Sequence, residues 1–432
     1  MNIKTDNHMQ NQTSKRHTDS PLNGGLRLLD EGIDKGTQRI EELHNSITER
    51  PYKTLNHIPL LNMVTAPLEN VQNSISSGIY QALRKAGHLV LRNAIRLESE
   101  QDLPPAVKAA GTDTVIGAAI NSAINGAIGD HLETTHNSLS LSMGFYHQNE
   151  PVELDADSLQ KQFPKLSEKI CIMVHGLCVN ESAWRSYSQQ HWGKSQDFGQ
   201  LLQQELGYTP FYVRYNSGRH ISHNGHDLDL LIEELVQNYP IDVKDIVIIG
   251  HSMGGLIARS ANHFTASSHT LWHTQLSQVI CLGSPHLGAP LEQVAHLGTA
   301  LLEQVSFTQP IAKIIKQRSI GIKDLRYGYV TDEDWDTQDQ DSLEGNKRTI
   351  AQQLKHVKYS FIGSSLSKDT QHPVAHILGD ILVPVKSSTG DHHAEELRVP
   401  YCDDRYKLLG GVNHIALQNH PLAYEQIKIW LS

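Results

Sequence analysis

The stretch IVIIGHSMGGLIAR, residues 246–259, constrains the fold of this chain more than any other segment. Its first four residues are β-branched, which is typical of a strand covered on both faces, whereas its last part fits a helix. Ser252 therefore stands at the corner between a strand and a helix. A sharp corner crowds the backbone, so the positions two residues to either side must be small, and they are Gly250 and Gly254. The pattern predicts a serine presented as a nucleophile.

Five short apolar runs follow one another in the second part of the chain, separated by stretches with a helical pattern. This alternation predicts a mostly parallel sheet with helices on both faces. The runs cover residues 170–174, 210–215, 246–250, 278–283 and 358–363. The segment 287–357 between the last two runs is much longer than an ordinary connection, and we expect it to form an inserted cap.

The chain before residue 165 has a different pattern. Residues 1–25 are polar, which predicts a disordered tail, and residues 26–164 carry apolar residues at helical spacing, which predicts a helical N-terminal extension. We assign residues 165–432 to the catalytic domain. One helix of the extension is expected to pack against the rest of the protein, with a lipid surface or a second subunit as the alternative. Its row of isoleucines is Ile116, Ile120, Ile124 and Ile128.

Charge and composition exclude several classes of function. The formal net charge of −10 argues against nucleic acid as a partner. The first residues contain no apolar run of the length that a secretory signal needs, and no stretch approaches a membrane-spanning length, so we expect a cytoplasmic protein with no transmembrane segment. No Cys/His cluster has the spacing of zinc ligands, and we expect neither a metal nor a cofactor.

Ser252 needs partners, because an alcohol is a poor nucleophile until a base takes its proton and a carboxylate orients that base. In enzymes that present a serine at such a strand-to-helix corner, the order along the chain is serine, acid, histidine. Asp380 follows the fifth apolar run in the segment GDILVP, and we expect it to be the acid. His414 follows a Gly-Gly turn and precedes the C-terminal helix, which favours it as the base over His420. The competing acids are Asp391, Asp403 and Asp404.

An acyl-transfer site also needs hydrogen-bond donors for the oxyanion of its tetrahedral intermediate. The backbone N–H of Met253, directly after the serine, is expected to be one donor. The second should come from the loop after an early strand, and the run at 170–174 is followed by the residues HGL. We therefore expect the backbone N–H of Leu177 to be the second donor, with Gly176 permitting the turn.

These segments together resemble the successive motifs of the α/β-hydrolase superfamily, and more narrowly its bacterial triacylglycerol-lipase branch, including PGAP1-like esterases. The motifs are IMVHGL, IVIIGHSMGGLIAR, CLGSPHLGAP, GDILVPVKSS and GGVNHIAL, spread over roughly residues 165–432. The resemblance implies an α/β-hydrolase fold and a carboxylic ester as substrate. It also implies a structural role for His286. The site residues that it implies are Ser252 as nucleophile, Asp380 as acid, His414 as base, and Leu177 and Met253 as oxyanion donors.

We therefore predict a serine ester hydrolase, a lipase or esterase, that acts on an acyl-ester or lipid substrate. Acyl transfer or thioester hydrolysis by the same residues is one alternative, because the same acyl-enzyme serves all three reactions. A catalytically silent scaffold whose N-terminal helices bind a partner is another. The sequence leaves contact with a lipid interface and the oligomeric state open.

Overall fold

A computed structural model describes residues 115–268, 270–290, 319–336, 348–371, 375, 379–392, 398–400 and 403–432. The predicted tail and most of the predicted N-terminal extension, residues 1–114, lie outside these residues. The same holds for residues 291–318 and 337–347 of the inserted segment.

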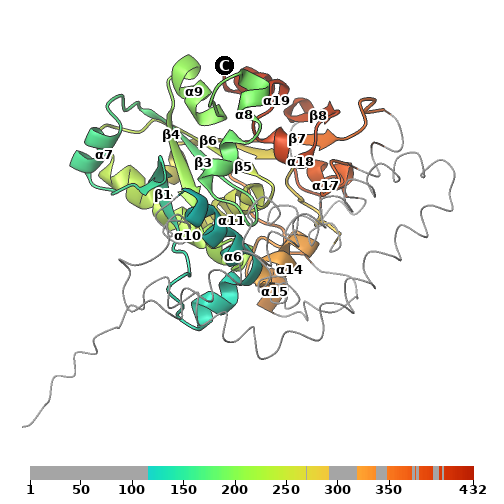
Figure 1. Cartoon of the computed structure of the whole chain (residues 1–432), viewed down its shortest axis with the longest axis horizontal. Coiled ribbons are helices and arrows are strands. Elements are labelled where there is room, and N and C mark those ends of the chain that lie inside the picture. Colours follow the sequence, from blue (N-terminus) through green and yellow to red (C-terminus); the bar gives the residue numbers. More distant parts are fainter. Residues whose placement is uncertain are drawn as a thin grey trace, which may run out of the picture.

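The described chain is built around an eight-stranded sheet with the strand order β2-β1-β4-β3-β5-β6-β7-β8 (Figure 1). Strands β3 to β8 pair in parallel, whereas β1 runs antiparallel to both β2 and β4. The strands are β1 Gly144–His147, β2 Glu150–Pro151, β3 Lys169–Val174, β4 Thr209–Arg214, β5 Asp245–His251, β6 Leu276–Leu282, β7 Lys358–Ser365 and β8 Tyr406–Gly410.

The five apolar runs predicted as strands are β3 to β7, and the mostly parallel sheet is confirmed. Strands β1, β2 and β8, at the two ends of the sheet, were not predicted. β1 and β8 each contain a single buried residue, so their sequences lack the continuous apolar run of a strand buried on both faces. Because β1 and β2 precede residue 165, the sheet begins before the position where we placed the start of the catalytic domain.

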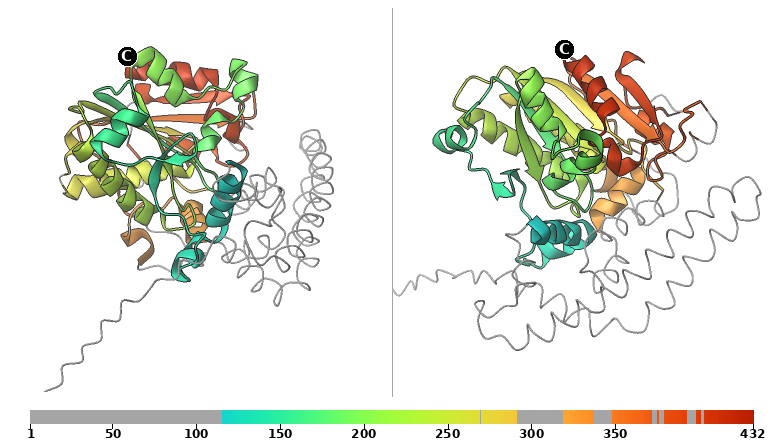
Figure 2. Two further views of the ribbon diagram at one scale, coloured as in Figure 1. Left: turned by 60° about the vertical axis from the view of Figure 1, so that its left-hand side comes forward. Right: turned by 45° about the horizontal axis from the view of Figure 1, so that its top comes forward.

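Helices cover both faces of the sheet (Figure 2). Alternate residues of β3 point to opposite faces, as the period of a strand requires. Ile170 and Ile172 pack with α10 (Ile221–Asn238) and α11 (Met253–Ser268), whereas Cys171 and Met173 pack with α9 (Phe198–Leu206) and α19 (Pro421–Leu431). The longer helices are α6 Val115–Thr134, α9 Phe198–Leu206, α10 Ile221–Asn238, α11 Met253–Ser268, α14 Ile320–Tyr327 and α19 Pro421–Leu431. The shorter ones are α7 Ala156–Gln162, α8 Ser188–Trp192, α15 Glu333–Asp336, α17 Val385–Thr389 and α18 His414–Leu417.

Helix α6 carries the predicted isoleucine row and packs closely against its surroundings. Its side chains at positions 120, 124 and 128 are buried. A Cβ atom added to Gly126 would lie 2.3 Å from Sγ of Cys178, so only glycine permits this approach. The hydroxyl of Ser319 donates a 2.7 Å hydrogen bond to the carbonyl of Gly126. Helix α6 and the start of α14, which belongs to the inserted segment, are therefore in direct contact.

No helix in the part of the chain that the structure describes is both long enough and apolar enough to cross a membrane.

Candidate active site

Ser252 lies between the end of β5 and the start of α11, at a backbone φ of 55°. A non-glycine residue in this left-handed region is strained by about 1–3 kcal/mol and persists only where its surroundings fix it. Two hydrogen bonds hold the corner: the N–H of Ser252 donates to the carbonyl of Leu282 at 2.8 Å, and the N–H of Gly255 donates to the carbonyl of Ser252 at 3.1 Å. The predicted strand-to-helix corner is therefore present.

The two glycines of the motif have no room for a side chain. A Cβ atom at Gly250 would lie 2.5 Å from the carbonyl carbon of Gly254, and one at Gly254 would lie 2.2 Å from the carbonyl oxygen of Val174. Real Cβ atoms essentially never approach other atoms so closely. The glycines thus allow α11 to begin directly against the ends of β3 and β5, which fixes the position of the serine between them.

Asp380 and His414 form a buried pair. Nδ1 of His414 donates to Oδ2 of Asp380 at 2.8 Å, and their side chains are only 2% and 1% exposed. Because a carboxylate can only accept, Nδ1 carries the proton and Nε2 is left as an acceptor. Nε2 is buried and has no hydrogen-bond partner among the described residues. The histidine is therefore held in the tautomer that can accept a proton at Nε2.

Other donors fix the carboxylate of Asp380. Its Oδ1 accepts from the backbone N–H groups of Leu382 at 3.1 Å and Val383 at 2.9 Å, and the Ser364 hydroxyl donates to Oδ2 at 3.2 Å. The backbone of the loop after β7 thus fixes the orientation of the carboxylate. With Oδ1 engaged by this loop, Oδ2 faces His414.

Two of the competing candidates, Asp391 and His420, make other contacts. Asp391 forms an exposed ion pair with Arg398, 3.1 Å between Oδ1 and Nε. His420 precedes α19, and its Nδ1 accepts from the N–H of Leu422 at 3.3 Å. The structure thus pairs His414, and not His420, with Asp380. The side chain of Asp403 lies outside the described residues.

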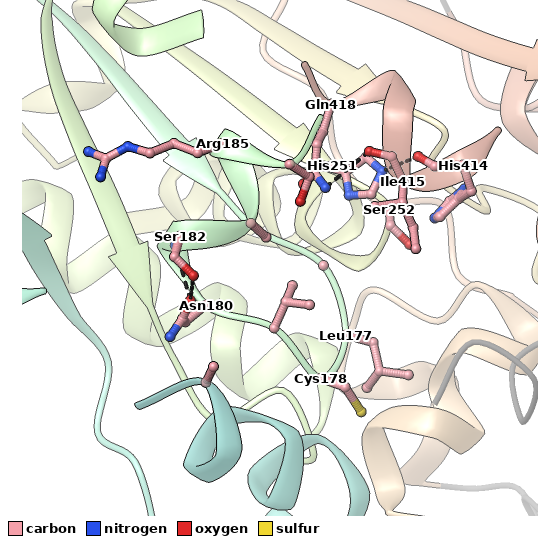
Figure 3. Close-up of a pocket in the computed structure, with 15 residues that line it drawn as sticks. Leu177, Cys178, Asn180, Ser182, Arg185, His251, Ser252, His414, Ile415 and Gln418 are labelled. Carbon is pink, nitrogen blue, oxygen red and sulfur yellow. Dashed lines mark hydrogen bonds between the residues drawn. The ribbon is translucent and has the colours of Figure 1, made fainter. Parts of the chain in front are cut away.

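A cavity of about 260 Å³ opens beside the serine (Figure 3). Ser252, His414 and Leu177 all line it. The loop that carries Leu177 approaches the serine closely, since a Cβ atom at Gly176 would lie 3.1 Å from Cβ of Ser252. Met253 begins α11 directly after the serine. The remaining lining residues are Ala119, Gly176, Cys178, Val179, Asn180, Ser182, Ala183, Arg185, Ser186, His251, Ile415 and Gln418.

Sequence reasoning missed His251, the residue before the serine. Its Nε2 lies 3.0 Å from the carbonyl oxygen of His414, which can only accept, so Nε2 carries a proton. Burial, and then the neighbouring His414, hold the pKa of His251 well below its ordinary value, so its ring stays neutral. This contact joins the end of β5 to the start of α18, 163 residues along the chain. The only signal in the sequence is its place inside the G-x-S-x-G motif.

Among the residues that the structure describes, no group of three or more His, Cys, Asp or Glu side chains is arranged to hold a metal ion.

The sheet order, the helices on both faces and the serine at the end of β5 define an α/β-hydrolase fold. Within this class the sequence matches the family described as the PGAP1-like alpha/beta domain over residues 165–389, which is more than half of the chain. The protein belongs to this family.

No curated protein matches the chain in sequence. Three solved structures illustrate the structural matches. The lipase BlEst2 of Bacillus licheniformis is 18% identical, with 67% of this chain and 97% of that chain covered and a TM-score of 0.36. The naproxen esterase of Bacillus subtilis is 13% identical, with 61% and 84% covered and a TM-score of 0.32. The phospholipase PlaB of Legionella pneumophila is 16% identical, with 61% and 58% covered and a TM-score of 0.35.

Proposed function

We propose that the protein is a serine hydrolase that cleaves carboxylic esters, with Ser252 as nucleophile, His414 as base and Asp380 as the residue that orients the base. One observation carries the proposal: the buried 2.8 Å hydrogen bond between Asp380 and His414 leaves Nε2 of the histidine without a partner among the described residues, in the cavity that the serine also lines. A base held in one tautomer beside a strained serine corner is the arrangement that acyl transfer requires.

In the proposed reaction the serine attacks first. His414 Nε2 takes the hydroxyl proton while Oγ of Ser252 bonds to the carbonyl carbon of the ester, and Asp380 stabilises the imidazolium that forms. The carbonyl oxygen becomes an oxyanion that accepts hydrogen bonds from the backbone N–H groups of Leu177 and Met253. The C–O bond to the alcohol then breaks, and the imidazolium returns its proton to the leaving oxygen. Water, activated by His414, releases the acid from the acyl-enzyme.

The lining of the cavity supports a neutral acyl ester. Leu177, Val179 and Ile415 present apolar surface beside Ser252, which suits an acyl chain. Arg185 is the cation among the lining residues, but its Nε donates to Asp197 at 3.3 Å and its guanidinium points away from Ser252 (Figure 3). With this arginine engaged elsewhere, an anionic group next to the scissile bond has no cation from the described lining to recognise it.

The test combines labelling and turnover. A fluorophosphonate probe should label the wild-type protein, which should also hydrolyse p-nitrophenyl esters, and Ser252→Ala should abolish both. Ser277→Ala is the matched control, because it removes a hydroxyl at the start of β6, away from the cavity. Labelling or turnover that survives in Ser252→Ala would refute the proposal.

A further inference from the structure

A second cavity, of about 30 Å³, shares no lining residue with the first. It lies between α11, the loop after β6, and the segments at 348–353 and 398–400. Arg259, Arg348 and Arg398 line it together with His286, and no carboxylate is among the described residues that line it. Three guanidinium groups around one small cavity repel one another unless an anion lies between them.

Arg259 is the most deeply placed of the three. It lies about two turns along α11 from the serine corner, is 7% exposed, and forms no ion pair with any described carboxylate. Its Nη1 lies 3.2 Å from Nδ1 of His286, and its Nε is buried without a hydrogen-bond partner among the described residues. Burial lowers the pKa of Arg259 to about 10, so the side chain stays charged near neutral pH.

His286 adds a further donor. A guanidinium can only donate, so Nδ1 of His286 accepts from Arg259 and the ring proton must reside on Nε2. That Nε2 is buried and has no acceptor among the described residues. Burial, with the positive charges of Arg259 and Arg348 as further causes, holds the pKa of His286 well below its ordinary value. His286 therefore holds a buried N–H donor close to Arg259.

Two described carboxylates, Asp334 and Asp391, interact with the arginines of the cavity, and they are fewer than the three guanidinium groups. Asp334 interacts electrostatically with Arg259 and Arg348, but its oxygens accept from three backbone N–H groups, those of residues 330, 331 and 349. Arg348 donates to the carbonyl of His286 at 2.8 Å, and Arg398 pairs with Asp391 at the surface. The positive charge of Arg259 and Arg348 therefore exceeds the negative charge of Asp334 beside them.

We propose that this cavity binds a small inorganic oxyanion, such as phosphate or sulfate, between Arg259 and Arg348, with Arg398 at its mouth. Guanidinium groups match the oxygens of such an anion with paired, charge-assisted hydrogen bonds. The small volume, about 30 Å³, favours a compact anion over one that carries a large organic group. Bound there, the anion would join α11 to the loop after β6 and to the segment at 348–353. It would thereby stabilise the position of α11 without contacting Ser252.

Calorimetry on the full chain tests the site, with inorganic phosphate titrated at constant ionic strength. The wild type should bind one phosphate saturably, and chloride should not compete at equal concentration. Arg348→Gln should weaken binding about tenfold or more, because one charge-assisted partner is lost. Arg219→Gln is the control, because this arginine already pairs with Glu133 and Asp227, and it should bind within about twofold of the wild type.

Further measurements test the location and the identity of the bound anion. Ser252→Ala should bind phosphate like the wild type, because the two cavities share no residue. Hydrogen exchange on the wild type should show phosphate-dependent protection near residues 259 and 348–353, which locates the anion even if a variant fails to fold. The absence of saturable binding, protection confined to other segments, equal weakening in Arg219→Gln, or tighter binding of glycerol 3-phosphate than of phosphate would each overturn the proposal.

Discussion

Ser252 shows how single residues determine the site. Its backbone φ of 55° is tolerated because the glycines on either side let α11, β3 and β5 meet around it. The corner at Ser252 and the pairing of Asp380 with His414 were predictable from the sequence, because small residues flank the serine and the order serine, acid, histidine is typical of this fold. Their catalytic roles stay predictions. The contact between His251 and the carbonyl of His414 was not predictable, since nothing local signals a partner 163 residues away.

The crowding at Gly254 gives a prediction about stability and activity together. Gly254→Ala places a Cβ atom 2.2 Å from the carbonyl oxygen of Val174, so the start of α11 must shift. We expect the free energy of unfolding to fall by about 1–3 kcal/mol and ester turnover to fall with it. Urea unfolding and a p-nitrophenyl ester assay measure the two effects. In the control Gly144→Ala the nearest atom is 3.7 Å away, and an equal loss there would show that crowding is not the cause.

At the scale of whole elements, strands buried on both faces were predictable and those at the ends of the sheet were not. The runs that became β3 to β7 are mostly apolar, because helices cover both of their faces. Strand β8 has a single buried position, and β1 is four residues long, so the sequence pattern of neither strand differs clearly from that of a loop. The three-arginine cavity was equally hidden, because its members come from separate segments of the chain.

Helix α6 offers a test of substrate selection, because Ala119 on this helix lines the cavity of Ser252. Ala119→Leu should narrow that cavity. We expect kcat/KM to fall more for long-chain than for acetate esters, since a long acyl chain needs the space that the new side chain fills. The control is Ala156→Leu, at an exposed position of α7. If the ratio of kcat/KM for long-chain esters to that for acetate esters is unchanged, α6 has a packing role only.

For the molecule as a whole, buried neutral histidines couple stability to pH. Burial is the main cause that lowers the pKa of His175 from 6.5 to about 3, and it holds those of His251 and His286 well below their ordinary values. The unfolded chain binds these protons below about pH 6.5, whereas the folded chain does not. Unfolding therefore takes up protons, and stability falls as the pH drops from about 6.5 towards 3.

We expect the free energy of unfolding to fall by up to about 1.4 kcal/mol per pH unit for each of these histidines. Urea unfolding at a series of pH values between about 7 and 5 measures the slope. His175→Phe keeps a ring stacked on Tyr215 but removes one titrating group. The free energy of unfolding of this variant should therefore depend less steeply on pH, by the contribution of one proton. A stability that stays constant over this range would contradict the account.

The central claim is that Ser252 and His414 act as one unit on an ester. The most direct measurement is kcat for a p-nitrophenyl ester in Ser252→Ala, His414→Ala and the double variant, with His420→Ala as the control. Residues that act as a unit lose activity non-additively, so the double variant should be no slower than the slower single variant, several orders of magnitude below the wild type. His420→Ala should retain wild-type turnover. Losses that multiply in the double variant, or full activity in His414→Ala, would contradict the account.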